Sequence, residues 1–82
     1  MNPLAQLLKF LTHLDSLGAG YMLSSDTDAI IVLVRTDAGI HEVSFFGDGA
    51  IEVSTFGASE EPESVNFAEL LEGFSAEDEQ KH

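Results

Sequence analysis

The sequence predicts an α+β fold in which an N-terminal helix and a C-terminal helix flank an antiparallel meander of three to four strands. Apolar residues recur with helical spacing before residue 17 and after residue 66, and short β-branched and aromatic runs lie between them. Short turns containing Gly or Asp separate those runs, which favours antiparallel neighbours. We expect one globular domain over residues 1–74 and a flexible acidic tail over residues 75–82.

The first helix is predicted from its cap and its leucine pattern. Asn2 is a good N-cap residue and Pro3 suits the first helical turn. Leucines then follow at the spacing of one helical face: Leu4, Leu7, Leu8, Leu11 and Leu14. The helix should end near Leu17, because Gly18-Ala19-Gly20 supplies the left-handed conformation that stops it.

The middle of the chain reads as four strands, over residues 21–24, 29–35, 40–46 and 50–56. If Gly47-Asp48-Gly49 closes the last hairpin, Ala50 pairs with Phe46. One face then carries Val43, Phe45, Ile51 and Val53, which suits a core. The opposite face carries Glu42, Ser44, Glu52 and Ser54 between Phe46 and Phe56, a mixed acidic and aromatic surface.

The strand from Ala29 to Val34 is apolar at every position, so one set of its side chains must point away from the core. The second helix, a homodimer or another partner could cover that set. The candidate hydrophobic interface on this face consists of Ile31, Leu33, Phe46 and Phe56.

The second helix follows a polar loop over residues 57–64, in which Pro62 blocks continuation of a strand. Asn66 and Glu69 have the spacing of a capping box. The apolar stripe behind them consists of Phe67, Leu70, Leu71 and Phe74.

Charge limits the classes of function. The chain has fifteen Asp and Glu but three Lys and Arg, which gives a net charge of -12. This charge disfavours direct binding to nucleic acid or to an anionic membrane and favours binding to a cationic protein surface. The 44% hydrophobic content and six Phe predict a folded chain. Without Cys, a basic leader at Met1-Asn2-Pro3 or an apolar run of about 20 residues, we expect a cytoplasmic protein that does not cross a membrane.

The motifs of common catalytic and metal sites are incomplete. Asp26-Thr27-Asp28 begins like an EF-hand loop, but Ile30 and Ile31 replace the next ligand and the required glycine. His13 and His41 have no G-x-S-x-G nucleophile turn to serve. The glycine turns lack the third glycine of a dinucleotide loop. We therefore expect a protein that is not an enzyme and that uses neither a metal nor a cofactor.

The acidic residues fall into two sets, one in tight turns and one in the last third of the chain. Carboxylates can replace DNA phosphates on a surface of Arg and Lys, which would make the protein an inhibitor by mimicry. The alternative is that the acids maintain solubility or reflect a salt-rich cytoplasm. The candidate partner-binding residues are Asp26, Asp28, Asp37, Glu42, Asp48, Glu52, Glu60, Glu61 and Glu63.

Several segments together resemble the small phage-encoded anti-CRISPR proteins. They are the capped first helix, the run Tyr21-Met22-Leu23-Ser24-Ser25-Asp26-Thr27-Asp28, Val32-Leu33-Val34-Arg35, Thr36-Asp37-Ala38-Gly39 with Glu42-Val43-Ser44, and the acidic C-terminus. The resemblance implies an inhibitor in the host cytoplasm whose acidic turns occupy the surface with which a Cas effector reads the PAM duplex.

Two other functions use the same features. An immunity or antitoxin protein would neutralise a basic toxin through the same electrostatics. A dimeric, chaperone-like module would instead use the apolar face of the strand from Ala29 to Val34. The sequence leaves open whether the chain is a monomer or a homodimer.

Overall fold

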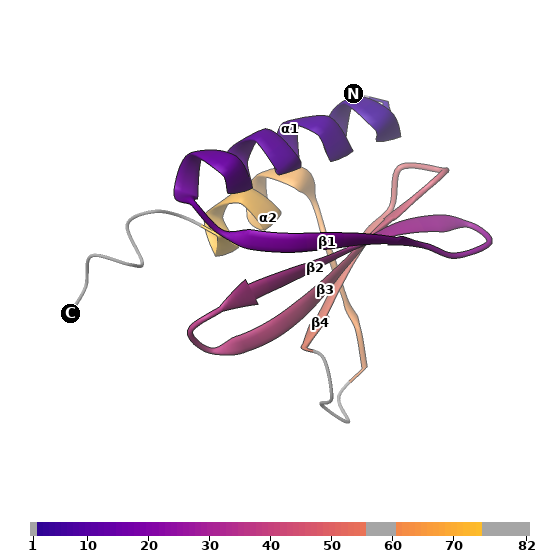
Figure 1. Cartoon of the computed structure of the whole chain (residues 1–82). Coiled ribbons are helices and arrows are strands. Elements are labelled where there is room, and N and C mark those ends of the chain that lie inside the picture. Colours follow the sequence, from indigo (N-terminus) through magenta and orange to yellow (C-terminus); the bar gives the residue numbers. More distant parts are fainter. Residues whose placement is uncertain (1, 56–60, 75–82) are drawn as a thin grey trace.

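A computed structural model describes residues 2–55 and 61–74, which form two layers (Figure 1). Two helices lie on one side of an antiparallel sheet whose strand order is the chain order. The α+β class and the order of helix, meander and helix are confirmed. The elements are α1 (Pro3–Leu17), β1 (Gly20–Ser25), β2 (Ala29–Thr36), β3 (Gly39–Phe46), β4 (Ile51–Thr55), β5 (Glu63–Val65) and α2 (Phe67–Gly73).

Helix α1 begins and ends where the sequence predicts. The side chain of Asn2 accepts a hydrogen bond from the backbone N–H of Ala5 at 2.7 Å, which satisfies one free donor of the first turn. Gly18 follows the last helical residue with a φ of 72°, and its N–H bonds to the carbonyl of Asp15 at 3.1 Å. Because only glycine adopts this left-handed conformation without strain, the chain turns directly into β1.

The predicted register of β3 and β4 is confirmed. Val43 lies opposite Val53, and Phe45 lies opposite Ile51. At the turn, the N–H of Phe46 donates to the carbonyl of Ala50 at 2.9 Å. Directly opposed residues share a face of a sheet, so the core face and the Glu42 and Glu52 face lie as the alternation predicts.

The core lies between the two helices and one face of the sheet. Strand β2 contributes Val32 and Val34 to it, whereas Ile31 and Leu33 point to the outer face and are half-exposed. Both helices lie on the core side, and no helix of the described residues covers the outer face (Figure 1). The second helix is therefore not the cover for the outward set. The buried core consists of Phe10, Leu14, Val32, Val34, Val43, Phe45, Ile51 and Leu70.

The C-terminal part contains one strand that the sequence does not predict. β5 pairs with β4, with Val65 opposite Ile51 and Glu63 opposite Val53. The sequence predicts a polar loop over residues 57–64, so the prediction is wrong for Glu63 and Ser64, which belong to this strand. The capping box of α2 is confirmed: Asn66 accepts from the N–H of Glu69 at 2.8 Å, and Glu69 accepts from the N–H of Asn66 at 2.9 Å. Phe56, Glu60 and the predicted tail over residues 75–82 lie outside the described residues.

Candidate binding surfaces

Two acidic turns lie side by side at one end of the sheet. The turn between β1 and β2 contains Asp26 and Asp28, and the turn between β3 and β4 contains Asp48. A hydrogen bond of 3.1 Å from the N–H of Gly47 to the carbonyl of Asp28 joins the two turns. We call the exposed carboxylates of Asp26, Asp28 and Asp48 the paired-turn surface.

Backbone hydrogen bonds orient two of these three carboxylates. Oδ1 of Asp26 accepts from the N–H of Thr27 at 2.7 Å, and Oδ1 of Asp48 accepts from the N–H of Ala50 at 2.9 Å. Such local bonds limit side-chain rotation while the second carboxylate oxygen stays available. The paired-turn surface thus presents negative charge from positions that the hairpins hold in place.

The other predicted acidic residues lie elsewhere. Asp37 is exposed in the turn between β2 and β3, which lies at the opposite end of the sheet because successive turns of a meander alternate. Glu61 and Glu63 are exposed in and beside the edge strand β5. The structure therefore separates the turn acids into two groups, and among the described residues only the turns of the paired-turn surface are joined by a hydrogen bond to each other.

The outer face of the sheet combines the remaining acids with apolar residues. Leu33 lies opposite Glu42, and Ile31 lies opposite Ser44, whose other neighbour is Glu52. Phe46 lies at the end of this face, opposite Ala29. All of these side chains are half-exposed. The structure thus brings together three members of the predicted hydrophobic interface, while Phe56, the fourth, lies outside the described residues.

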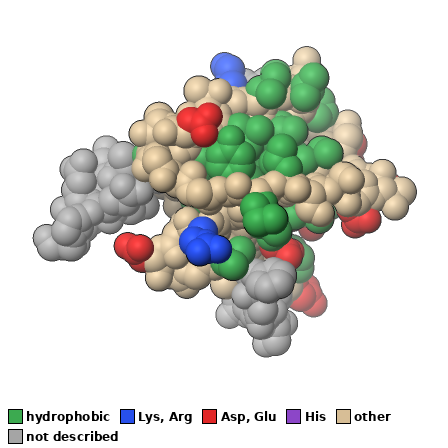
Figure 2. Space-filling view, in the orientation of Figure 1, with side chains coloured by type: hydrophobic (Ala, Val, Ile, Leu, Met, Phe, Trp, Pro, Cys, Tyr) green, Lys and Arg blue, Asp and Glu red, His purple; other side chains and the backbone are tan. Residues whose placement is uncertain are grey.

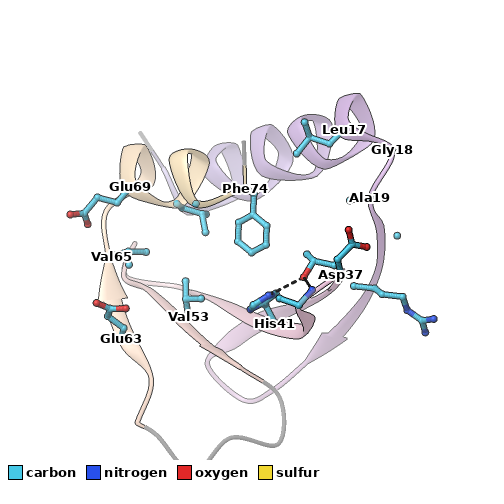
Figure 3. A pocket seen from close by; sticks show the side chains of 16 residues that line it. Leu17, Gly18, Ala19, Asp37, His41, Val53, Glu63, Val65, Glu69 and Phe74 are labelled. Carbon is cyan, nitrogen blue, oxygen red and sulfur yellow. Dashed lines mark hydrogen bonds between the residues drawn. The ribbon is translucent and has the colours of Figure 1, made fainter. Parts of the chain in front are cut away.

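A groove with a volume of 870 Å³ opens between α2, the C-terminal end of α1 and the turn that contains Asp37 (Figure 3). Phe74 points into it from the end of α2, above His41 on β3, and their rings meet edge to face with centroids 5.7 Å apart. Asp37, Glu63 and Glu69 lie around the groove. Its lining combines an apolar floor with a charged rim, to which Arg35 also belongs.

The two histidines in the described residues hold parts of the fold together. The Thr36 hydroxyl donates a hydrogen bond to the carbonyl of Gly39 at 3.2 Å. Because the proton of this hydroxyl is used there, His41 Nε2, which lies 3.1 Å from the hydroxyl oxygen, donates to that oxygen. His13 donates through Nε2 to the carbonyl of Phe74. In residues 2–55 and 61–74, no group of three or more His, Asp or Glu is arranged to hold a metal ion.

The phenol of Tyr21, at the start of β1, lies 3.3 Å from Oδ1 of Asp15 on α1 and donates to it. Partial desolvation raises the pKa of Tyr21 above its ordinary value of 10.0, and the negative charge of Asp15 and this hydrogen bond raise it further. The contact ties the acidic end of α1 to the free edge of the sheet.

Sequence reasoning missed the exposed side chains around β1. Met22 is 68% exposed and Leu23 is 52% exposed, although their run reads as an ordinary strand. The signal was available in the order of elements, because the first strand of a meander has only one strand neighbour. No helix within the described part of the chain is long and apolar enough to span a membrane.

Comparison of the chain with protein-family models, with curated proteins and with solved structures finds no match. Its surfaces are therefore the basis on which we infer a function.

Proposed function

We propose that this protein is a non-enzymatic inhibitor whose paired-turn surface binds a cationic, nucleic-acid-binding surface of a target protein. The observation that carries the proposal is the hydrogen bond between Gly47 and Asp28, which joins two exposed acidic turns into one surface. The target class that we favour is a Cas effector, so that the chain acts as an anti-CRISPR protein by mimicking DNA.

Charge-assisted hydrogen bonds supply the attraction. Arg and Lys side chains that bind phosphates also bind carboxylates, and Arg does so with two parallel bonds. Because backbone bonds already orient Asp26 and Asp48, less side-chain entropy is lost when a partner binds. The net charge of -12 adds long-range attraction that raises the association rate.

The geometry also suits competition with DNA. The centres of the two turns are two strand spacings apart, about 10 Å. Their carboxylates can therefore reach several cationic side chains that line one DNA-binding groove of the target protein. A Cas effector reads the PAM duplex with Arg side chains that enter the major groove. An acidic protein that covers these Arg side chains prevents the PAM duplex from reaching them.

The test is affinity capture from a lysate of bacteria that carry a CRISPR–Cas system, with three forms of the chain as bait. The forms are the natural chain, Asp48→Lys in the paired-turn surface, and Asp37→Lys at the opposite end of the sheet. Both variants change the net charge equally, so a difference between them reports position rather than total charge.

We expect the natural chain and Asp37→Lys to retain a Cas effector, and Asp48→Lys to retain at least tenfold less, because a like charge replaces an attraction. Equal retention of the Cas effector by both variants would show that the paired-turn surface is not its binding site. Retention of a basic toxin in place of a Cas effector would contradict the proposed target class and favour an immunity protein.

A further inference from the structure

Strand β1 is an open edge of the sheet. Among residues 2–55 and 61–74 it pairs only with β2, and its residues, Gly20 to Ser25, include no charged side chain and no proline. The other edge differs: β5 has three residues, includes Glu63 and follows Pro62, which are features that protect an edge from further pairing. Within the described residues, the sheet is thus open at one side and protected at the other.

The direction of the free peptide groups follows from the first turn. The N–H of Asp26 donates to the carbonyl of Ala29 at 2.8 Å, so this opposed pair is hydrogen-bonded. Hydrogen-bonded pairs alternate along an antiparallel ladder, and Met22 and Ser24 therefore bond to β2 in the same way. The peptide groups of Tyr21, Leu23 and Ser25 point away from the sheet.

Exposed hydrophobic side chains surround this edge. Leu4 and Leu8, 63% and 54% exposed, share a stripe of α1 with Leu11 and Asp15. The hydrogen bond between Tyr21 and Asp15 places that stripe on the side of α1 nearest β1. Figure 2 shows hydrophobic side chains gathered over α1 and β1. Leu23 belongs to the core face of β1 and Met22 to its outer face, so both faces of the edge are apolar.

We propose that β1 pairs antiparallel with β1 of a second copy, about a two-fold axis at Leu23. In this register Leu23 faces Leu23 of the partner subunit, and Tyr21 faces Ser25 of the partner subunit. Each outward peptide group of one copy then meets an outward peptide group of the other, so every N–H and carbonyl of the pair is satisfied. The two sheets join into one, with both helix layers on the same side.

The same register produces complementary charges. Arg35 lies opposite Gly20 on the outer face, and extension of the paired register places Asp26 of the partner subunit beyond Gly20. Because glycine has no side chain, the exposed Arg35 can reach across it to that carboxylate, over about two strand spacings. The two-fold axis forms this ion pair twice, and it engages one of only three Lys and Arg residues in the chain.

Self-pairing also explains the leucines of α1. A two-fold axis perpendicular to the sheet brings the two copies of α1 toward each other on the same side. The exposed stripes that contain Leu4 and Leu8 then lie on the sides of the two helices that face the partner subunit. An extended peptide from another protein could pair with β1, but it would supply no such helix.

The first experiment measures self-association by sedimentation over a wide concentration range, with the natural chain, Leu23→Glu and Leu33→Glu. We expect a dimer that Leu23→Glu weakens by about a hundredfold, because two carboxylates then face each other at the axis. Leu33→Glu, on the outer face, should leave the dimer unchanged. Leu23 is half-exposed, and circular dichroism checks that each variant stays folded.

The second experiment exchanges the proposed ion pair. Arg35→Asp and Asp26→Arg should each weaken the dimer by about tenfold, and the double variant should restore it. Asp48→Arg changes the net charge as much as Asp26→Arg but lies away from the edge, so it should not weaken the dimer.

A natural chain that stays monomeric at every concentration would overturn the proposal. So would a dimer that Leu33→Glu dissociates and Leu23→Glu does not, since that result assigns the interface to the outer face. Failure of the double variant to restore association would overturn the register.

Discussion

Single residues connect the layers of this small fold. Phe10 is fully buried on α1, and its ring centroid lies 5.5 Å from that of Phe45 on β3 and 5.5 Å from that of Phe74 after α2. Tyr21 makes a similar link at the surface through its phenol and Asp15. Substitutions at Phe10 and Asp15 therefore test the packing and the electrostatics separately.

Phe10→Ala should lower the free energy of unfolding by about 3–5 kcal/mol, because it removes a buried ring and leaves a cavity. A domain of this size has a total stability of roughly 4–12 kcal/mol, so the variant should be close to unfolding. Urea denaturation measures the change. Lys9→Ala, at the neighbouring exposed position, is the control and should change stability by less than about 0.5 kcal/mol. Equal effects would contradict the position of Phe10 in the core.

Asp15→Asn should lower the pKa of Tyr21 toward 10.0, because it removes a negative charge that opposes ionisation of the phenol. Since the folded state raises this pKa, the stabilisation is fully present below the unfolded value and is lost as pH rises through the folded value. Tyr21 is the chain's single tyrosine, so ultraviolet absorbance follows its titration directly. A titration midpoint that Asp15→Asn does not move would contradict the contact.

At the scale of elements, local signals predict most of the fold. Asn2 and Gly18 mark both ends of α1, and Gly47-Asp48-Gly49 sets the register of β3 and β4. β5 could not be predicted in this way, because two of its residues, Glu63 and Ser64, are exposed and polar and its pairing depends on β4. A short edge strand is defined by its neighbour more than by its own pattern.

The candidate sites divide similarly between what local sequence predicts and what it does not. The acids in the turns could be identified because tight turns expose their residues. The contact between the turns containing Asp28 and Asp48 could not, since it depends on the pairing of β2 with β3, which continues past Ala29 and Phe46 and places Gly47 opposite Asp28. The exposure of Leu23 at the sheet edge could not be predicted either, because it depends on how much of β1 the helix α1 covers.

Asn66→Ala should destabilise the protein by about 1 kcal/mol, because the N–H of Glu69 loses its acceptor at the start of α2. Glu69→Gln is the matched control, since Gln also completes a capping box and should cost much less. Thermal unfolding of both variants provides the measurement. A loss for Glu69→Gln as large as that for Asn66→Ala would contradict the assigned role of the cap.

At the scale of the whole molecule, charge and apolar surface occupy different places. The paired-turn surface lies at one end of the sheet, and the apolar side chains surround the β1 edge. A dimer through β1 would engage Asp26 in the ion pair with Arg35 of the partner subunit and would leave Asp28 and Asp48 of each paired-turn surface uncovered. The two proposals are therefore compatible, and each can fail without the other.

Added sodium chloride should raise the melting temperature of the protein. With a net charge of -12, the folded chain repels itself, and salt screens that repulsion. Calorimetry at increasing salt concentration measures the effect. Asp37→Lys makes the net charge less negative, so its melting temperature should rise less with salt. A melting temperature that falls with salt would mean that attractive charge pairs dominate the folded state.

Competition with duplex DNA tests whether the acidic turns occupy a DNA-binding surface. The acidic chain is immobilised and the target protein that it captures is bound to it. Duplex DNA containing the sequence that the target protein recognises is then added. We expect that DNA releases the captured protein, and that DNA already bound to this protein prevents its capture. If the chain and the DNA bind that protein together without affecting each other, the claim that the acidic turns occupy a DNA-binding surface is contradicted.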